Sequence, residues 1–140
     1  GLYGIGADEQ LQNCSSLKTV ISQIKTVKIG ESVGYSRSYT AHETVRIAIV
    51  PIGYADGLNR ALSNGKGLLY VKGKKASIIG NICMDMCMID ISQIDAKEGD
   101  EVIVWNSQQH IEEMAESLNT IAYEILTNVS QRVKRVFLQD

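Results

Sequence analysis

The sequence predicts a mainly β domain, an antiparallel β-barrel-like sheet with a short helical insert near residues 109–126. Up to Trp105, apolar residues recur mostly with the two-residue period of half-buried strands, and turn residues interrupt them at short intervals. After Ser107 the period becomes that of a helix. Many short strands separated by close turns are typical of a β-barrel or a β-sandwich.

Size and composition limit the class of protein. A chain of 140 residues, 44% hydrophobic and 21% charged, is typical of one soluble globular domain. The net charge of −2 and the lack of a basic run argue against nucleic acid or an anionic membrane as a partner. No membrane span or signal peptide is recognisable, so we expect a cytoplasmic protein. Cys14, Cys83 and Cys87 are odd in number, which favours reduced, buried thiols over a disulfide framework.

The strands are predicted from β-branched or alternating segments. Residues 45–50 read as a half-buried strand that ends at Pro51, because proline cannot donate to a central ladder. Gly53 and Asp56–Gly57 then supply turn chemistry. The remaining predicted strands are residues 17–29 (one long or bent strand), 33–39 (with a bulge or close approach at Gly34), 68–71 and 76–79 (a hairpin), 82–91 (buried on both faces), 101–105 and 133–138.

The helical segments come late. Ile111, Met114, Ala115 and Leu118 have helical spacing and predict a helix over residues 110–118 that begins near Ser107 or Gln108. We expect Asn119 to end it, and Thr120 to cap a second short helix that includes residues 123–126. A single helical turn is expected around residues 58–62.

Three side chains raise the question of chemistry. Asp85 stands in an apolar segment and would be costly to bury without partners. It is either a structural carboxylate, the reading we favour on its own, or part of a site wall. Tyr35 and Tyr54 stand near predicted strand ends, where they could face a cleft, but each could equally be a packing aromatic.

Five ordered motifs carry a resemblance to a known family. They are VGYSRSY at residues 33–39, PIGYADG at 51–57, GNICMD at 80–85, TIAYE at 120–124 and RVKRV at 132–136. Together they resemble the C-terminal domain of alanine racemases. The opening Gly1–Gly4 resembles the last strand of that family's N-terminal (β/α)₈ barrel. The resemblance therefore implies that residues 1–8 end a preceding barrel domain and that residues 9–140 form the β-domain.

The resemblance also implies an activity. The family comprises isomerases that interconvert L- and D-alanine, a peptidoglycan precursor, with pyridoxal 5'-phosphate held by a lysine of the N-terminal domain. It works as a homodimer in which this domain faces the cofactor of the partner subunit. The expected partners are therefore the barrel domain, the second subunit and a small amino-acid substrate. Because that lysine lies outside the chain, we expect the isolated domain to be inactive.

Individual roles follow residue by residue from the matched motifs. Tyr35 is implied as the base on one face of the substrate, with the lysine on the other, because racemisation needs two opposed proton carriers. The implied substrate-binding residues are Tyr54, which narrows the active-site entrance, Met84, whose backbone N–H holds the substrate carboxylate, and Asp85. Tyr123 is implied as a ligand of the cofactor phosphate, and no metal is expected. Arg60 and Ile121 fall at positions that line the access path.

Three departures from the family pattern affect the expected substrate range more than the reaction type. Asn81 stands where the family commonly has arginine, Lys134 where it usually has proline, and Gly34 where serine is frequent. One alternative is a racemase domain for another small amino acid such as serine. A second is a non-catalytic β-barrel module whose tyrosines anchor an interface. The related decarboxylases of basic amino acids share the architecture, but their motifs have no match in this sequence.

Overall fold

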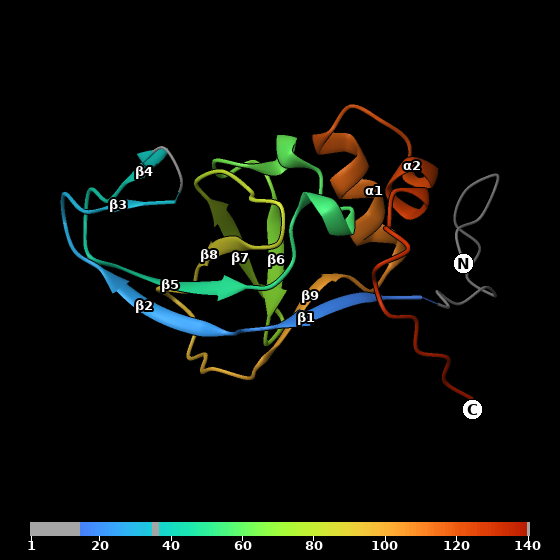
Figure 1. Ribbon diagram of the computed structural model, residues 1–140, viewed down its shortest axis with the longest axis horizontal. Helices are drawn as coiled ribbons and strands as arrows, with labels where there is room; N and C mark the ends of the chain where they lie inside the picture. Colours follow the sequence, from blue (N-terminus) through green and yellow to red (C-terminus); the bar gives the residue numbers. More distant parts are fainter. Residues whose placement is uncertain (1–14, 35–36, 140) are drawn as a thin grey trace.

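The computed structural model describes residues 15–34 and 37–139 (Figure 1). The expected boundary between residues 8 and 9, and Cys14, lie outside the described residues. Strands and two α-helices make up the regular structure. The strands are β1 (Leu17–Val20), β2 (Gln23–Val27), β3 (Ser32–Val33), β4 (Tyr39–Thr40), β5 (Val45–Val50), β6 (Leu68–Val71), β7 (Lys74–Ile79), β8 (Cys87–Asp90) and β9 (Glu101–Trp105). The helices are α1 (Gln108–Ser117) and α2 (Ala122–Thr127).

Seven strands form one antiparallel sheet in the order β1-β9-β6-β7-β8-β5-β2. The two edge strands, β1 and β2, are consecutive in the chain and are separated only by Ile21 and Ser22. These two residues continue the pairing on both sides, since the Ile21 amide donates to Asp100 and the Ser22 amide to Ile49 (2.9 Å each). The sheet therefore curls until its edges meet in one bent segment, and the predicted barrel-like fold is confirmed.

The predicted hairpin of residues 68–71 and 76–79 is present as β6 and β7, and its second strand begins two residues earlier than predicted, at Lys74. Lys72 and Gly73 connect the strands with φ of +50° and +75°. Positive φ at both central residues is typical of the turns that match the right-handed twist of a hairpin. Leu69 and Val71 on β6 are fully buried, while their neighbours are half-buried, as the alternation predicts.

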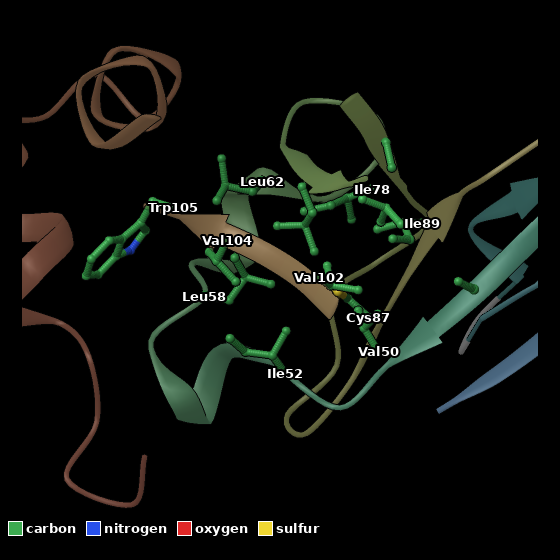
Figure 2. Packing of buried hydrophobic residues seen from close by; sticks show 14 of the residues in the cluster. Val50, Ile52, Leu58, Leu62, Ile78, Cys87, Ile89, Val102, Val104 and Trp105 are labelled. Carbon is green, nitrogen blue, oxygen red and sulfur yellow. The ribbon is translucent and has the colours of Figure 1, made fainter. Parts of the chain in front are cut away.

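A single large core fills the barrel. Figure 2 shows side chains from β5, β7, β8 and β9 meeting those of the connections between strands, among them Leu58 and Leu62. Leu58 and Leu62 are each 1% exposed, and Leu62 lies in the 3₁₀ turn Arg60–Leu62, which confirms the helical turn expected there. Burial on this scale is the main source of stability for such a domain.

A second, smaller cluster lies under the β3–β4 hairpin. It joins Val33 and Ala41 to β2, β5, β7 and β8 through Val27, Val45, Ile47, Ile79 and Met88. The expected continuous strand over residues 33–39 is wrong, because Val33 pairs antiparallel with Tyr39 and the chain must reverse between them. Gly34, with φ of +85°, begins that reversal rather than forming a bulge.

Helices α1 and α2 lie together at one end of the sheet, and α1 contacts β9 (Figure 1). Ser107 is the N-cap of α1 as predicted, and its hydroxyl accepts from the His110 amide at 3.2 Å. The expected cap of α2 by Thr120 is wrong, since Ile121 occupies the N-cap and makes no side-chain hydrogen bond there. Ile111 and Ala115 turn the buried face of α1 toward the core.

Two predicted strands are shorter or missing. Residues 82–91 form a strand only from Cys87 to Asp90, because the amide of Cys83 donates to Met86 (2.9 Å) and folds the preceding residues into a loop. Asp85 is consequently exposed and not buried among apolar residues. Residues 133–138 form no strand. Val136, Phe137 and Leu138 are between 68% and 89% exposed, and no strand in the described part of the chain pairs with them.

Candidate active site

The loop that follows β5 carries Tyr54. Its turn is closed by the Asp56 carboxylate, whose Oδ2 accepts from the Gly53 amide at 2.9 Å. Gly57 ends the turn in the left-handed region, with φ of +113°. The sequence predicted this turn chemistry. The closed turn leaves the Tyr54 side chain 44% exposed.

This loop is hydrogen-bonded to the loop that carries Met84. The amides of Tyr54 and Ala55 donate to the carbonyl oxygens of Cys83 and Met84, each at 3.0 Å. Gly53 makes the approach possible, because a Cβ there would collide with those same carbonyl oxygens. The structure therefore brings together Tyr54, Met84 and Asp85, which the sequence places about thirty residues apart.

The two backbone polar groups of Met84 differ in their hydrogen bonding. Its carbonyl is used by Ala55, but its N–H has no acceptor within residues 15–34 and 37–139. The residue as a whole is 52% exposed. A backbone donor fixed in this way is a suitable partner for an anionic oxygen.

A third segment, residues 128–132, completes the cluster. Gly57 lies so close to Asn128 that a Cβ at residue 57 would meet the Asn128 carbonyl oxygen at 2.5 Å. The Ser130 amide donates to the Asp56 carbonyl oxygen at 3.0 Å. Helix α2 leads directly into this segment and carries Tyr123, whose side chain is 49% exposed.

Arg132 binds both acidic residues of the two preceding loops. Its Nε lies 2.9 Å from Asp56 Oδ1, and its Nη2 lies 2.5 Å from Asp85 Oδ1. The hydrogen bond to Asp85 and the charge of Asp56 raise the pKa of the guanidinium above its ordinary value. Sequence reasoning gave Arg132 no role, and no short-range pattern could have paired it with partners so distant in the chain.

Tyr35 lies outside the described residues, but its flanks are placed. On one side Val33 is 6% exposed and belongs to the smaller core cluster. On the other, the Ser38 hydroxyl accepts from the Asn81 amide at 3.1 Å. The hairpin that carries Tyr35 is thus attached to the beginning of the loop that carries Met84.

The residues expected to line an access path are exposed. Ile121 is 65% exposed at the start of α2, and Arg60 is exposed at the start of the 3₁₀ turn Arg60–Leu62. Asn81, the departure from the family pattern, accepts at its Oδ1 from Asn64 Nδ2 (3.0 Å). This neutral pair occupies the position where an arginine would bring positive charge.

Cys83 and Cys87 are both free thiols in this part of the molecule. Cys87 is buried, and burial, with a smaller contribution from Cys83, raises its pKa to about 12. Its thiol is therefore a packing group rather than a nucleophile. Over the described ranges no three His, Cys, Asp or Glu side chains come together as a metal site would require, and no helix there has the length and hydropathy to cross a membrane.

Comparison with known proteins agrees with this arrangement. Residues 14–137 match the family model "Alanine racemase, C-terminal domain". An alanine racemase of Cutibacterium acnes is 44% identical over 99% of this chain and 40% of its own length. One from Desulfosudis oleivorans is 40% identical over 91% of the chain and 34% of its own length.

Solved structures show the same fold. An alanine racemase of Clostridium difficile 630 superposes with a TM-score of 0.82 and 42% identity, covering 88% of this chain and 32% of that one. The alanine racemase of Bartonella henselae, solved with covalently bound pyridoxal phosphate, has a TM-score of 0.80 and 36% identity, covering 86% and 34%. The chain spans between a third and two-fifths of the length of the curated relatives named above. By sequence and by fold, it belongs to the alanine racemase family and represents the C-terminal domain of that family.

Proposed function

We propose that this chain is the C-terminal part of an alanine racemase and supplies one proton carrier and part of the substrate-binding surface. The observation that carries the proposal is the junction of the Tyr54 and Met84 loops, which leaves the Met84 N–H without an acceptor in the described part of the chain. A substrate carboxylate bound to that N–H would be fixed in orientation, and a fixed substrate is a condition for directed proton transfer. The exposed ring of Tyr54 would narrow the approach to it.

The residues of this chain fit pyridoxal phosphate as a cofactor. The hydroxyl of Tyr123 is on an exposed side chain and has no hydrogen-bond partner among residues 15–34 and 37–139, so it can donate to a phosphate oxygen. When bound, the cofactor withdraws electrons from the α-carbon of the substrate and so acidifies its proton. The lysine that would hold the cofactor is expected in the part of the protein outside this chain.

Tyr35 would move the α-proton on one face of the substrate, with its phenol oxygen as the donor and acceptor atom. A phenol has a reference pKa of about 10, so the site must favour the deprotonated oxygen for Tyr35 to act as a base near neutral pH. The hairpin anchored at Val33 and Ser38 would present that oxygen to the active site of a partner subunit in a homodimer. Free thiols at Cys83 and Cys87 are consistent with a reducing compartment such as the cytoplasm.

The test is an assay of the full-length protein that carries this chain. Conversion of L-alanine to D-alanine, dependent on added pyridoxal phosphate, is the expected result, with L-serine as the competing substrate. The isolated 140-residue chain should neither turn over alanine nor form a borohydride-stable adduct with the cofactor. Full-length protein that dimerises but racemises no amino acid would instead support a non-catalytic association module.

A further inference from the structure

We propose that Arg132 is a positioning residue of the racemase site, one that holds the Met84–Asp85 turn against the Tyr54 loop. The expected effect of Arg132 on turnover rests on the proposed function. The expected effect of Arg132 on the two loops rests on their geometry alone. Arg132 binds the carboxylates of Asp56 and Asp85 and not the Met84 N–H, so its effect on that N–H is carried by these two carboxylates.

The first step is the bridging geometry. Asp56 uses Oδ2 to close its own turn on the Gly53 amide and Oδ1 to bind Arg132 Nε. Asp85 binds a different nitrogen of the same guanidinium, Nη2. A planar guanidinium fixes the directions of both hydrogen bonds, which a lysine ammonium would not do. The two carboxylates are therefore set at a defined separation.

The second step is the rigidity of the base from which Arg132 reaches. The Arg135 guanidinium donates to the carbonyl oxygens of Ser130 and Val133, at 2.5 and 2.7 Å, and so braces the chain on both sides of Arg132. The Ser130 amide is bound in turn to the Asp56 carbonyl oxygen. The backbone of the segment that carries Arg132 is thus fixed to the Tyr54 loop independently of the ion pair between Arg132 and Asp85.

The third step is what the bridge holds. Asp85 is adjacent to Met84, whose N–H is the proposed carboxylate donor, and the Asp85 side chain is 60% exposed. Apart from Arg132, no described residue binds that carboxylate. Without Arg132 the turn keeps its two backbone bonds to Tyr54 and Ala55 but loses the ion pair that Asp85 makes with Arg132. The orientation of the Met84 N–H then becomes less defined.

The experiment compares Arg132→Gln with Lys18→Gln in the full-length protein. Lys18 and Glu101 form an ion pair of similar exposure (46% and 56%) on β1 and β9, so Lys18→Gln removes a charge of the same sign from a comparable surface pair. In hydrogen exchange, Arg132→Gln should speed exchange of residues 82–86 several-fold, and Lys18→Gln should not. Unchanged exchange at residues 82–86 in Arg132→Gln would overturn the proposal, whether or not the protein racemises alanine.

Kinetics supply the second readout. Arg132→Gln should raise KM for alanine by about 10-fold or more, because misplacement of a binding group weakens a positioned substrate. Asp85→Asn should raise KM in the same way. The double variant should have a KM little above that of either single variant, since both substitutions break the same ion pair between Arg132 and Asp85. Arg132→Lys should restore only part of the affinity. A parent protein without racemase activity would contradict the proposed function alone, whereas additive effects of the two substitutions on KM would contradict the role of that ion pair.

Discussion

The phenol ring of Tyr70 on β6 is stacked on the imidazole of His110 on α1, with centroids 3.9 Å apart and planes 8° from parallel. The Tyr70 hydroxyl donates to Glu113 Oε2 at 3.3 Å, and burial, followed by the charge of Glu113, raises the pKa of the phenol. His110 also accepts at Nδ1 from the Asn106 amide (3.4 Å). The stack therefore joins the first turn of the helix to the barrel wall, and it does so with a neutral imidazole.

This stack predicts a loss of stability in mild acid. Burial lowers the pKa of His110, Glu113 opposes that shift and Lys75 adds to it. A histidine whose folded pKa lies below its unfolded value of about 6.5 favours the folded state when neutral. The stabilisation that neutral His110 contributes is then fully present above about pH 6.5 and is lost as the pH falls through the folded pKa. Denaturant unfolding of the full-length protein at a series of pH values should show this loss.

The control for that measurement is the second histidine. His42 is exposed, so His42→Gln should leave the pH dependence of the parent in place. His110→Gln should flatten the curve below about pH 6.5 while lowering stability in weakly alkaline solution through loss of the stack. An unaltered curve in His110→Gln would assign the acid sensitivity to other groups.

Gly53→Ala should damage the site without affecting the barrel strands. Its φ of −144° suits any residue, so the only obstacle is the added Cβ, which would collide with the carbonyl oxygens of Cys83 and Met84. Overpacking of this kind costs about 1–3 kcal/mol. We expect a corresponding drop in the free energy of unfolding and a raised KM for alanine. Gly30→Ala, where nothing lies within 4 Å of the added Cβ, should change stability through its positive φ but leave KM unchanged.

The N-cap of α1 gives a smaller, local prediction. Ser107→Ala removes the acceptor of the His110 amide and should destabilise the protein by about 0.5–2 kcal/mol. Ser117→Ala is the matched control, because that hydroxyl only donates back to the Glu113 carbonyl near the end of the same helix. Chemical denaturation of the two variants should separate them. Equal losses would mean that the cap contributes nothing specific.

The sequence predicts the strands better than it predicts the loops, for a physical reason. Residues 45–50 are largely β-branched, and the hairpin of β6 and β7 has apolar residues in partial alternation; both segments formed strands close to the predicted bounds. The apolar residues before Cys87 have the composition of a strand. There the backbone bonds from Tyr54 and Ala55, distant in the chain, hold a loop instead. Residues 133–138 are β-branched and aromatic, but composition cannot supply a partner strand.

In the candidate site, too, the sequence indicates local features but not the contacts between distant segments. The motifs identified Tyr54, Met84 and Tyr123 by resemblance, and the turn role of Asp56 followed from its chemistry alone. The ion pairs of Arg132 depend on three loops that meet only in the folded barrel. The predicted buried strand over residues 82–91 was wrong at Asp85, because the local turn carries that side chain to the surface, where Arg132 binds it.

The last prediction concerns Tyr35, and it separates a catalytic from a packing role. A packing tyrosine changed to Phe keeps its ring and loses at most one hydrogen bond of about 0.5–1.5 kcal/mol.

If Tyr35 is a proton carrier, Tyr35→Phe should lower the rate of racemisation far more, because removal of a general base commonly lowers a rate by about 10²–10⁴-fold. In full-length Tyr35→Phe protein we therefore expect intact binding of pyridoxal phosphate and a loss of that size in racemisation. Exchange of the α-proton with deuterated solvent, followed by NMR, should fall more for one enantiomer of alanine than for the other, since the opposite face keeps its own base. Tyr54→Phe should be milder, and Tyr39→Phe, on the half-buried strand β4, should be nearly silent. Exchange of both enantiomers at parental rates in Tyr35→Phe would remove Tyr35 from the mechanism and leave the family membership of the chain intact.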